Sequence, residues 1–591
     1  MIVIFSDLYG TMRDMTKRRY YRVLAAFLVL SLFAVAFAQR RPPRTPEPKR
    51  PRLVLLIAVD QFRYDYLERF GDLFVANGFK RLLRDGASWT QSNYDHMPTY
   101  TAPGHATMLT GAFPAQSGVI GNYWFDRASG RRVSSVSDET VKALGGPPNE
   151  PAASPRRLLA STVGDELRLL SNDRAKVIGI SVKDRSAILP AGRHANAAYW
   201  LGDTFGGMVS STYYFDQLPA WVSAFNQTNP VDKYFGQKWE RLLPESEYTK
   251  RAGPESPPWE KVTASGDTNA FPHIITGGAA KPGTNFYTHL DHSPFTNDIL
   301  LEFAQQAIIN EQLGADDDTD VLSVSFSASD YVGHRYGPYS HEVMDLTLRF
   351  DRTIAGLLDF VNERVGLSNT LLAFTSDHGV SPIPEQAEAL GLGGARIKFN
   401  DIVETINKAI SARYNPQGKS PDPTADYLLR NRDTATGREW FLNGNLYFNY
   451  EALRRDNVSV EDLSQVVVEA ALTIPGVARA FSRAQLLRGP TTITDPIERR
   501  VVHGFHPARS GEVVLVAEPY KYLADFTTAT HGSAYTYDTH VPTIIMGTGI
   551  IPGRYHEAAS PADIAPTLSA VLRITPPTSS AGRVLIEAIK K

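Results

Sequence analysis

A hydroxyl-rich stretch at residues 93–124 holds the group best suited to attack phosphorus. Thr101 stands two residues before the proline of a Pro-Gly-His turn, which leads into a run expected to be helical at residues 106–109 and closed by Gly111. The first N–H groups of a helix point at a ligand placed before it, and the helix dipole favours negative charge there. We therefore interpret Thr101 as a nucleophile, with Thr99, two residues earlier, as the competing hydroxyl.

Six side chains that bind metal ions follow four runs with the composition of buried strands. They are Asp60, Asp330, His334, Asp377, His378 and His531. The carboxyl ends of parallel strands meet at one edge of a sheet, so these side chains are expected to converge. The chain has no cysteine, so a metal site must use imidazole and carboxylate ligands, which zinc accepts. Six ligands divide into two sites of three, and two ions ~3.5–4 Å apart can stabilise both the attacking and the leaving oxygen.

Two cations, Lys183 and Arg185, follow another expected strand at residues 176–182. Side chains two residues apart in an extended chain share a face, so both could donate hydrogen bonds to one anion. Their other interpretation is a solvated turn. A threonine hydroxyl needs activation, and coordination to a metal supplies it. The sequence therefore predicts metal ions beside Thr101 and two cations around a phosphoryl group.

The elements that must position these residues alternate between apolar runs and amphipathic segments. Strands are expected at residues 52–59, 176–182, 320–326, 370–375, 512–517 and 543–546. Helices are expected at residues 64–85, 158–170, 296–313, 344–365 and 560–572. Near-continuous apolar strands are typical of parallel sheets that are buried on both faces. We therefore predict an α/β fold, a doubly wound and mostly parallel sheet with helices on both faces.

Composition divides the chain further. Residues 52–395 and 508–591 are expected to form the catalytic domain, with residues 198–286 as an ordered insertion over its sheet. Residues 396–507 mix helical patterns with short tyrosine- and asparagine-rich strands, which indicates an inserted α+β subdomain. Residues 39–51 are rich in proline and arginine and are expected to be an extended linker.

The first 38 residues have the pattern of a signal peptide. Basic residues at 17–22 precede an apolar run at 23–37, and Ala-Phe-Ala at 36–38 is a small-residue cleavage pattern. A periplasmic or secreted product without a stable membrane partner is expected, with an uncleaved anchor as the alternative and Met15 as a second candidate start. The formal net charge of −2 indicates no basic surface for nucleic acid. A monomer is favoured, although the sequence does not give the oligomeric state.

Together these motifs resemble the alkaline phosphatase superfamily, in the branch of type I phosphodiesterases and nucleotide pyrophosphatases. The resemblance rests on Asp60, on Thr-Ala-Pro-Gly-His beginning at Thr101, on Asp-x-x-x-His beginning at Asp330, on Asp-His-Gly beginning at Asp377 and on His-Gly beginning at His531. Within that branch, Gly-Asn-x-Trp around Asn122 and the Lys183-x-Arg185 pair are similar to PafA-like periplasmic alkaline phosphatases, which use a threonine nucleophile.

The resemblance implies a role for each of these residues and two zinc ions as cofactors. Thr101 is expected to form a phosphothreonine intermediate and to be a metal ligand itself. The zinc ion that activates Thr101 is expected on Asp60, Asp377 and His378. The zinc ion that stabilises the leaving group is expected on Asp330, His334 and His531. The non-bridging phosphoryl oxygens are expected on Asn122, Lys183 and Arg185.

The substrate class follows from the charge around the phosphoryl group. Two cations and an amide complement the dianion of a phosphate monoester better than a diester, so small-molecule monoesters are the predicted substrates. The alternatives are a phosphodiesterase or nucleotide pyrophosphatase on the same metals, and a non-catalytic, metal-stabilised binding protein. A sulfatase is disfavoured because the nucleophile is threonine rather than cysteine or serine. His540 is the competing ligand for His531, and four further histidines are expected to be structural: His105, His341, His503 and His506.

Overall fold

The computed structural model describes residues 19, 22 and 50–590, without residues 203, 261–267, 430–440, 490–493 and 524–526. The chain divides into two units, Met1–Lys49 and Arg50–Lys591. Apart from residues 19 and 22, the predicted signal peptide at 1–38 lies outside the described residues, and so does most of the predicted linker at 39–51. Within the described part, no helix combines the length and the apolar character needed to cross a membrane.

The second unit is built on a sheet of ten strands in the order β20-β2-β19-β12-β1-β11-β6-β7-β8-β5. Its centre consists of β12 (Thr370–Ser376), β1 (Leu53–Val59), β11 (Asp320–Phe326), β6 (Val177–Ser181) and β7 (Ala197–Leu201), which are all parallel. Towards one edge, β19 (Thr543–Gly547) is antiparallel to β12 and to β2 (Gly86–Ser92), which pairs with β20 (Gly553–Ala559) in parallel. At the other edge, β8 (Met208–Ser211) is antiparallel to β7 and to β5 (Ala143–Leu144). The predicted α/β fold with a mostly parallel central sheet is confirmed.

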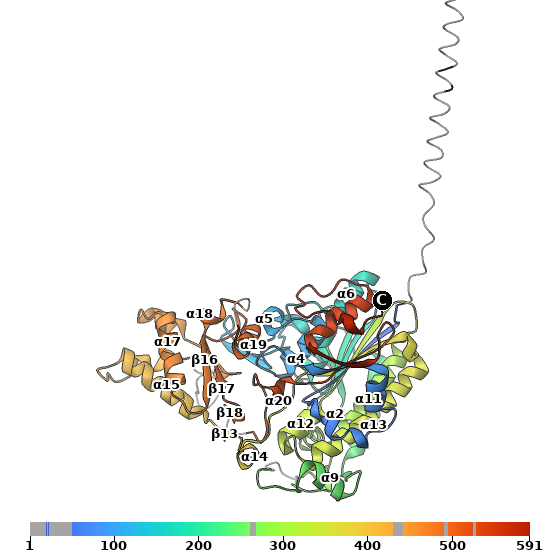
Figure 1. Cartoon of the computed structure of the whole chain (residues 1–591), viewed down its shortest axis with the longest axis horizontal. Coiled ribbons are helices and arrows are strands. Elements are labelled where there is room, and N and C mark those ends of the chain that lie inside the picture. The colour runs from blue at the N-terminus through green and yellow to red at the C-terminus, as the bar shows by residue number, and fades with distance from the viewer. Residues whose placement is uncertain are drawn as a thin grey trace, which may run out of the picture. The chain divides into compact units, whose positions relative to one another are not determined.

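Helices cover both faces of this sheet because its strands are apolar on both sides. Successive residues of β1 alternate between two separate hydrophobic clusters. One cluster packs the sheet against α11 (Phe295–Asn310) and α13 (His341–Arg364). The other packs it against α4 (Thr101–Thr110), α6 (Val163–Ser171) and α21 (Ile564–Leu572). Figure 1 shows the strands between these two groups of helices.

The helix expected at residues 64–85 is broken. The chain forms α2 (Asp65–Arg69), a single 3-10 turn and α3 (Phe79–Asp85). The break is fixed by Asp351 of α13, whose carboxylate accepts hydrogen bonds from the backbone N–H of Val75 (2.5 Å) and Phe79 (2.7 Å). A tertiary contact from a distant helix therefore holds the break, which also contains Gly71 and Gly78, residues that weaken a helix.

Two other helices start elsewhere than expected, and a third helix was not expected. The helix expected at 106–109 begins at Thr101, since Pro103 falls in the first turn, where its missing N–H costs nothing. The helix expected at 158–170 begins at Val163, because Thr162 and Asp165 form a capping box. Lys183 is not followed by extended chain, because α7 (Asp184–Ala191) begins at once.

A second sheet has four strands, and three of them come from the segment predicted as an inserted subdomain. Its order is β14 (Phe441–Leu442), β15 (Asn445–Leu446), β17 (Val513–Ala517) and β16 (Val477–Ser482), and it packs against α15 (Phe399–Tyr414) and α17 (Val460–Ala471). The expectation that residues 512–517 return to the main sheet is wrong, since β17 pairs with β15 and β16. The apolar composition of residues 512–517 suits the core of either sheet, and only the strand pairing shows to which sheet these residues belong. The boundaries 396–507 stay a prediction.

Candidate active site

Three carboxylates meet where neighbouring strands end. In the register of the sheet, Val59 of β1 lies level with Phe326 of β11 and Ser376 of β12. Asp60 and Asp377 therefore leave adjacent strands side by side, and Asp330 lies in the first turn of α12 (Ala328–Tyr336), directly after β11. All three carboxylates are buried. The predicted convergence of these strand ends is present in the structure.

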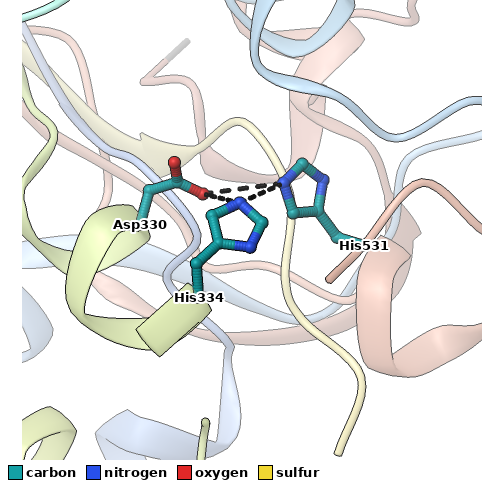
Figure 2. Close-up of side chains that lie close together, drawn as sticks. All are labelled: Asp330, His334 and His531. Atoms are coloured by element: carbon teal, nitrogen blue, oxygen red, sulfur yellow. Dashed lines mark hydrogen bonds and ion pairs between the residues drawn. The ribbon is translucent and has the colours of Figure 1, made fainter. Parts of the chain in front are cut away.

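Asp330 forms a cluster with two histidines (Figure 2). His334 lies one turn after Asp330 on α12, and its Nε2 is 3.2 Å from Asp330 Oδ1. His531 arrives from the C-terminal part of the chain, with its Nε2 3.6 Å from the same oxygen and 3.3 Å from His334 Nε2. The Nδ1 atoms are held by backbone carbonyls, His334 by Ala529 (2.7 Å) and His531 by Thr99 (2.8 Å). These bonds turn both Nε2 atoms toward Asp330, the arrangement that metal-binding histidines require.

A second set of donor atoms is formed by Asp60, Asp377 and His378. His378 Nε2 lies 3.4 Å from Asp60 Oδ1 and 3.3 Å from Asp377 Oδ2. These three atoms are buried, and none has a hydrogen-bond partner within the described residues. Ligand bonds of ~2.0–2.1 Å in a tetrahedral zinc site give ligand separations of about 3.3 Å. Both the distances and the chemistry of the donors therefore fit a zinc ion.

The two sets adjoin. Donor atoms of Asp60, Asp330 and His378 also lie within 4.8 Å of one another, so Asp330 is close to both sets. Such closeness is the condition for two ions that act on the same phosphoryl group. Among the described residues, the groups of three such side chains whose donor atoms all lie within 4.8 Å of one another are Asp330 with His334 and His531, and Asp60 with Asp330 and His378.

The electrostatics of the cluster favour a bound cation. Burial raises the pKa of Asp60 well above its usual range, and the nearby carboxylates add to the rise. Burial opposes the charge of Asp330 too, but the neighbouring imidazole and the Lys183 ammonium hold its pKa well below the usual range. Burial lowers the pKa of His378 to about 3 and lowers that of His531, so both rings are neutral near pH 7. Burial opposes the charge of His334 as well, but the Asp330 carboxylate raises the pKa of this ring, so a metal ion would displace its proton. The neutral rings of His378 and His531 beside crowded carboxylates are in the state that binds metal ions.

Thr101 is the first residue of α4, and residues near it in the chain contact members of both sets. One turn later, His105 Nδ1 donates a hydrogen bond to Thr101 O (2.8 Å) and lies 3.3 Å from Asp377 Oδ2. On the other side, Thr99 contacts His531 through its carbonyl oxygen. The Thr99 hydroxyl donates to Ser533 O (2.9 Å), which leaves Thr101 as the better placed hydroxyl.

Asn122 joins Thr101 from a loop before β3 (Tyr123–Asp126). Its side-chain oxygen accepts a hydrogen bond from the Ala102 backbone N–H (2.8 Å). This bond fixes the oxygen end of the amide against α4, so the NH₂ end points away from the helix backbone. Lys183 Nζ lies 2.6 Å from Asp60 Oδ2 and 2.5 Å from Asp330 Oδ2, so it joins the two ligand sets. Arg185 lies two residues on, in the first turn of α7, and its Nε is buried without a hydrogen-bond partner in the described part of the chain.

Several residues of this region were not assigned a role at the site from the sequence. His105 was expected to be structural, but it contacts Asp377 and also Ser325 Oγ (2.7 Å). The ring of Tyr331 lies 4.9 Å from Lys183 Nζ. Spacing alone could have drawn attention to His105, four residues after Thr101 on a helix.

His540, the competing candidate for the ligand role of His531, makes other contacts. Its Nε2 contacts Thr90 O and its ring stacks on Tyr64.

Comparison with known proteins gives consistent matches over most of the chain. The model of the family described as type I phosphodiesterase / nucleotide pyrophosphatase matches residues 54–533. Alkaline phosphatase PhoV of Synechococcus elongatus is 36% identical over 92% of this chain and 93% of that protein. A calcium-transporting ATPase of Myroides odoratus is 35% identical over 92% of this chain and 95% of that protein.

Solved structures extend these matches to the fold. The crystal structure of wild-type alkaline phosphatase PafA has a TM-score of 0.83 and 33% sequence identity, covering 92% of this chain and 99% of that chain. A variant of the same enzyme, with a threonine replaced by serine and an asparagine, a lysine and an arginine replaced by alanine, has a TM-score of 0.82. The family model, the relatives and the fold agree, and the chain belongs to the type I phosphodiesterase / nucleotide pyrophosphatase family.

Proposed function

We propose that this chain is an exported alkaline phosphatase that hydrolyses small-molecule phosphate monoesters with two zinc ions and a phosphothreonine intermediate. The observation that carries the proposal is the pair of adjoining donor sets at the strand ends, beside the first residue of α4. The relatives PhoV and PafA are named alkaline phosphatases, which supports phosphatase activity. The signal-peptide pattern of residues 1–38 supports export.

The two donor sets divide the ligands between two metal positions. One ion would be held by Asp60, Asp377 and His378, with the Thr101 hydroxyl beside it. The other would be held by Asp330, His334 and His531. When bound, the ions supply positive charge for the attacking and departing oxygens. Zinc fits the donor chemistry, because imidazole and carboxylate ligands at tetrahedral separations suit that ion.

The protein's own groups then carry out two displacements at phosphorus. The Thr101 oxygen forms a bond to phosphorus as the bond to the alcohol oxygen breaks, which leaves phosphothreonine and releases the alcohol. Water then attacks the phosphothreonine, forms the new P–O bond and returns the hydroxyl of Thr101. The dipole of α4 favours the negative phosphoryl group throughout, because Thr101 is the first residue of this helix.

The monoester preference follows from three donors around the phosphoryl oxygens. Lys183 has three N–H donors and uses two on Asp60 and Asp330, so one remains for substrate. The Asn122 NH₂ and the Arg185 guanidinium supply the others. In the solved PafA variant, a threonine, an asparagine, a lysine and an arginine were replaced. The number of residues between that threonine and that asparagine is the same as between Thr101 and Asn122. The arginine lies two residues after the lysine, as Arg185 does after Lys183. The same four residue types in the same arrangement support these roles.

The experiment compares the rates of purified protein on p-nitrophenyl phosphate and on its bis ester. Thr101→Ala should abolish hydrolysis of both esters, whereas Thr99→Val, which removes only the hydroxyl bound to Ser533, should leave most activity. A wild-type protein faster on the diester would favour the second candidate, a phosphodiesterase, which the description of the family model supports. Full activity of Thr101→Ala would refute the mechanism.

A further inference from the structure

Gln61 is a buried polar residue with an unusual backbone at the end of β1. It follows Asp60, its φ is 62°, and its side chain is 2% exposed. Residues other than glycine rarely adopt positive φ, and the conformation costs of the order of 1 kcal/mol or more. A glutamine held in this conformation inside the site therefore needs contacts that fix it there.

The contacts of Gln61 reach both ligand sets. Its backbone N–H donates to Asp377 Oδ1 (3.0 Å), and its side-chain Nε2 donates to Asp330 Oδ1 (2.6 Å). Since Gln61 is also bonded covalently to Asp60, one residue connects three of the carboxylates assigned to the metals. Within the described residues, the side-chain oxygen of Gln61 has no hydrogen-bond partner, so the amide is held by its donor end.

The surrounding chain leaves a space shaped for this side chain. Gly333 lies on α12, one residue before His334, and faces the Gln61 amide. A Cβ at this position would overlap Gln61 Oε1 and would lie 3.0 Å from its Cδ. The glycine therefore lets the amide reach Asp330, and the placement of Gln61 depends on the helix that carries Asp330 and His334.

The two hydrogen bonds orient the carboxylates of Asp377 and Asp330, each in a different way. Asp377 Oδ1 accepts from the backbone N–H of Gln61 and of His378, so Oδ2 is the oxygen that faces the His378 ring. Asp330 Oδ1 faces both imidazoles, and the amide of Gln61 occupies another of its lone-pair directions. Hydrogen bonds of this kind orient metal-binding carboxylates.

We propose that Gln61 is a positioning residue that couples the two metal positions by fixing the carboxylates of Asp330 and Asp377 relative to Asp60. The inference rests on the proposed metal function. Gln61 contacts no substrate in this role. It acts on the affinity for metal ions. The Gln61 side chain orients Asp330, and the Gln61 backbone N–H orients Asp377.

The test measures zinc binding directly. Gln61→Met keeps the length and volume of the side chain but removes the N–H donor, and Gln61→Asn keeps the amide but is too short to reach Asp330. Metal-free protein is titrated with zinc against a chromophoric chelator, and thermal melting reports folding. In both variants, one of the two zinc-binding steps should weaken by about 10–100-fold, and activity should return at excess zinc.

Tyr248→Phe is the matched control. It removes one donor from another buried carboxylate, Asp345, which is outside the site. This variant should lower the melting temperature without changing zinc affinity. Unchanged zinc affinity in folded Gln61→Met and Gln61→Asn would overturn the inference while leaving the proposed function intact. A wild-type protein that binds no zinc would instead overturn the proposed function, and this inference with it.

Discussion

Gly104 offers a sharp test of how closely the nucleophile helix must approach the metal ligands. It lies in the first turn of α4, three residues after Thr101, and faces the backbone of Asp377. A Cβ at this position would lie 2.6 Å from Asp377 Cβ and 2.7 Å from Asp377 Cα. Gly104→Ala therefore forces α4 and Asp377 apart, and Thr101 moves with the helix.

The size of the effect follows from these distances. Carbon atoms make favourable contact at about 3.5 Å, so the separation of 2.6 Å must grow by about 1 Å. The opposing atoms belong to the main chain and to a short buried side chain, so neither can rotate away. A misplacement of about 1 Å between reacting groups costs about 100-fold in rate, or about 2.7 kcal/mol in the barrier. Overpacking of the core costs a further 1–3 kcal/mol in the free energy of unfolding, roughly.

The assay measures kcat/KM on p-nitrophenyl phosphate together with urea denaturation. Gly104→Ala should remain folded and lose about 100-fold in kcat/KM. Gly71→Ala is the control, because a Cβ there meets nothing within 4 Å, and it should change neither quantity. If folded Gly104→Ala kept a rate within about threefold of wild type, the close approach of α4 to Asp377 would not position the nucleophile.

Three further predictions concern charge, substrate and metal. Replacing both Lys183 and Arg185 by alanine should slow monoester hydrolysis by about 100-fold or more and diester hydrolysis far less, and equal losses on the two esters would contradict the monoester assignment. Removal of metal by a chelator should abolish activity and lower the melting temperature, with zinc restoring both; at a zinc concentration of about 100 times Kd the ion adds about 2.7 kcal/mol to the free energy of unfolding. Burial raises the pKa of Asp538 to about 7, so its contribution to stability is complete below the unfolded pKa near 3.8 and is lost as the pH rises to about 7. Relative to Asp538→Asn, the wild type should therefore lose about 2–4 kcal/mol between about pH 4 and about pH 8 in urea denaturation, and parallel profiles would show that Asp538 does not titrate there.

The central sheet could be predicted because its strands are uniformly apolar. The runs at 320–326 and 370–375 became β11 and β12 with almost unchanged limits. The run at 512–517 has the same composition but belongs to the smaller sheet, where Val513 and Leu515 pack with α15 and α17. Composition identifies a buried strand, whereas its partners depend on contacts between residues far apart in the chain.

The convergence of the donor side chains could also be predicted, because a polar residue at the end of an apolar strand is conspicuous in a sequence. The residues that orient those side chains could not. His105 looks like part of a turn until α4 is seen to begin at Thr101, which places its ring on Asp377. Gln61 has no local signal other than its position after Asp60, and its role depends on a backbone conformation that the sequence does not show.

Lys183 shows how the structure changes an interpretation while keeping the residue. The sequence paired it with Arg185 as two donors on one face of an extended chain. Because α7 begins directly after Lys183, the two side chains leave from different backbone conformations, and the Lys183 ammonium reaches Asp60 and Asp330 instead. The oxygens that it binds are the Oδ2 atoms, whereas the Oδ1 atoms face the histidines. Lys183 can therefore neutralise both carboxylates and still donate to a phosphoryl oxygen, so the charge that orders the ligands and the charge that selects a dianion come from one side chain.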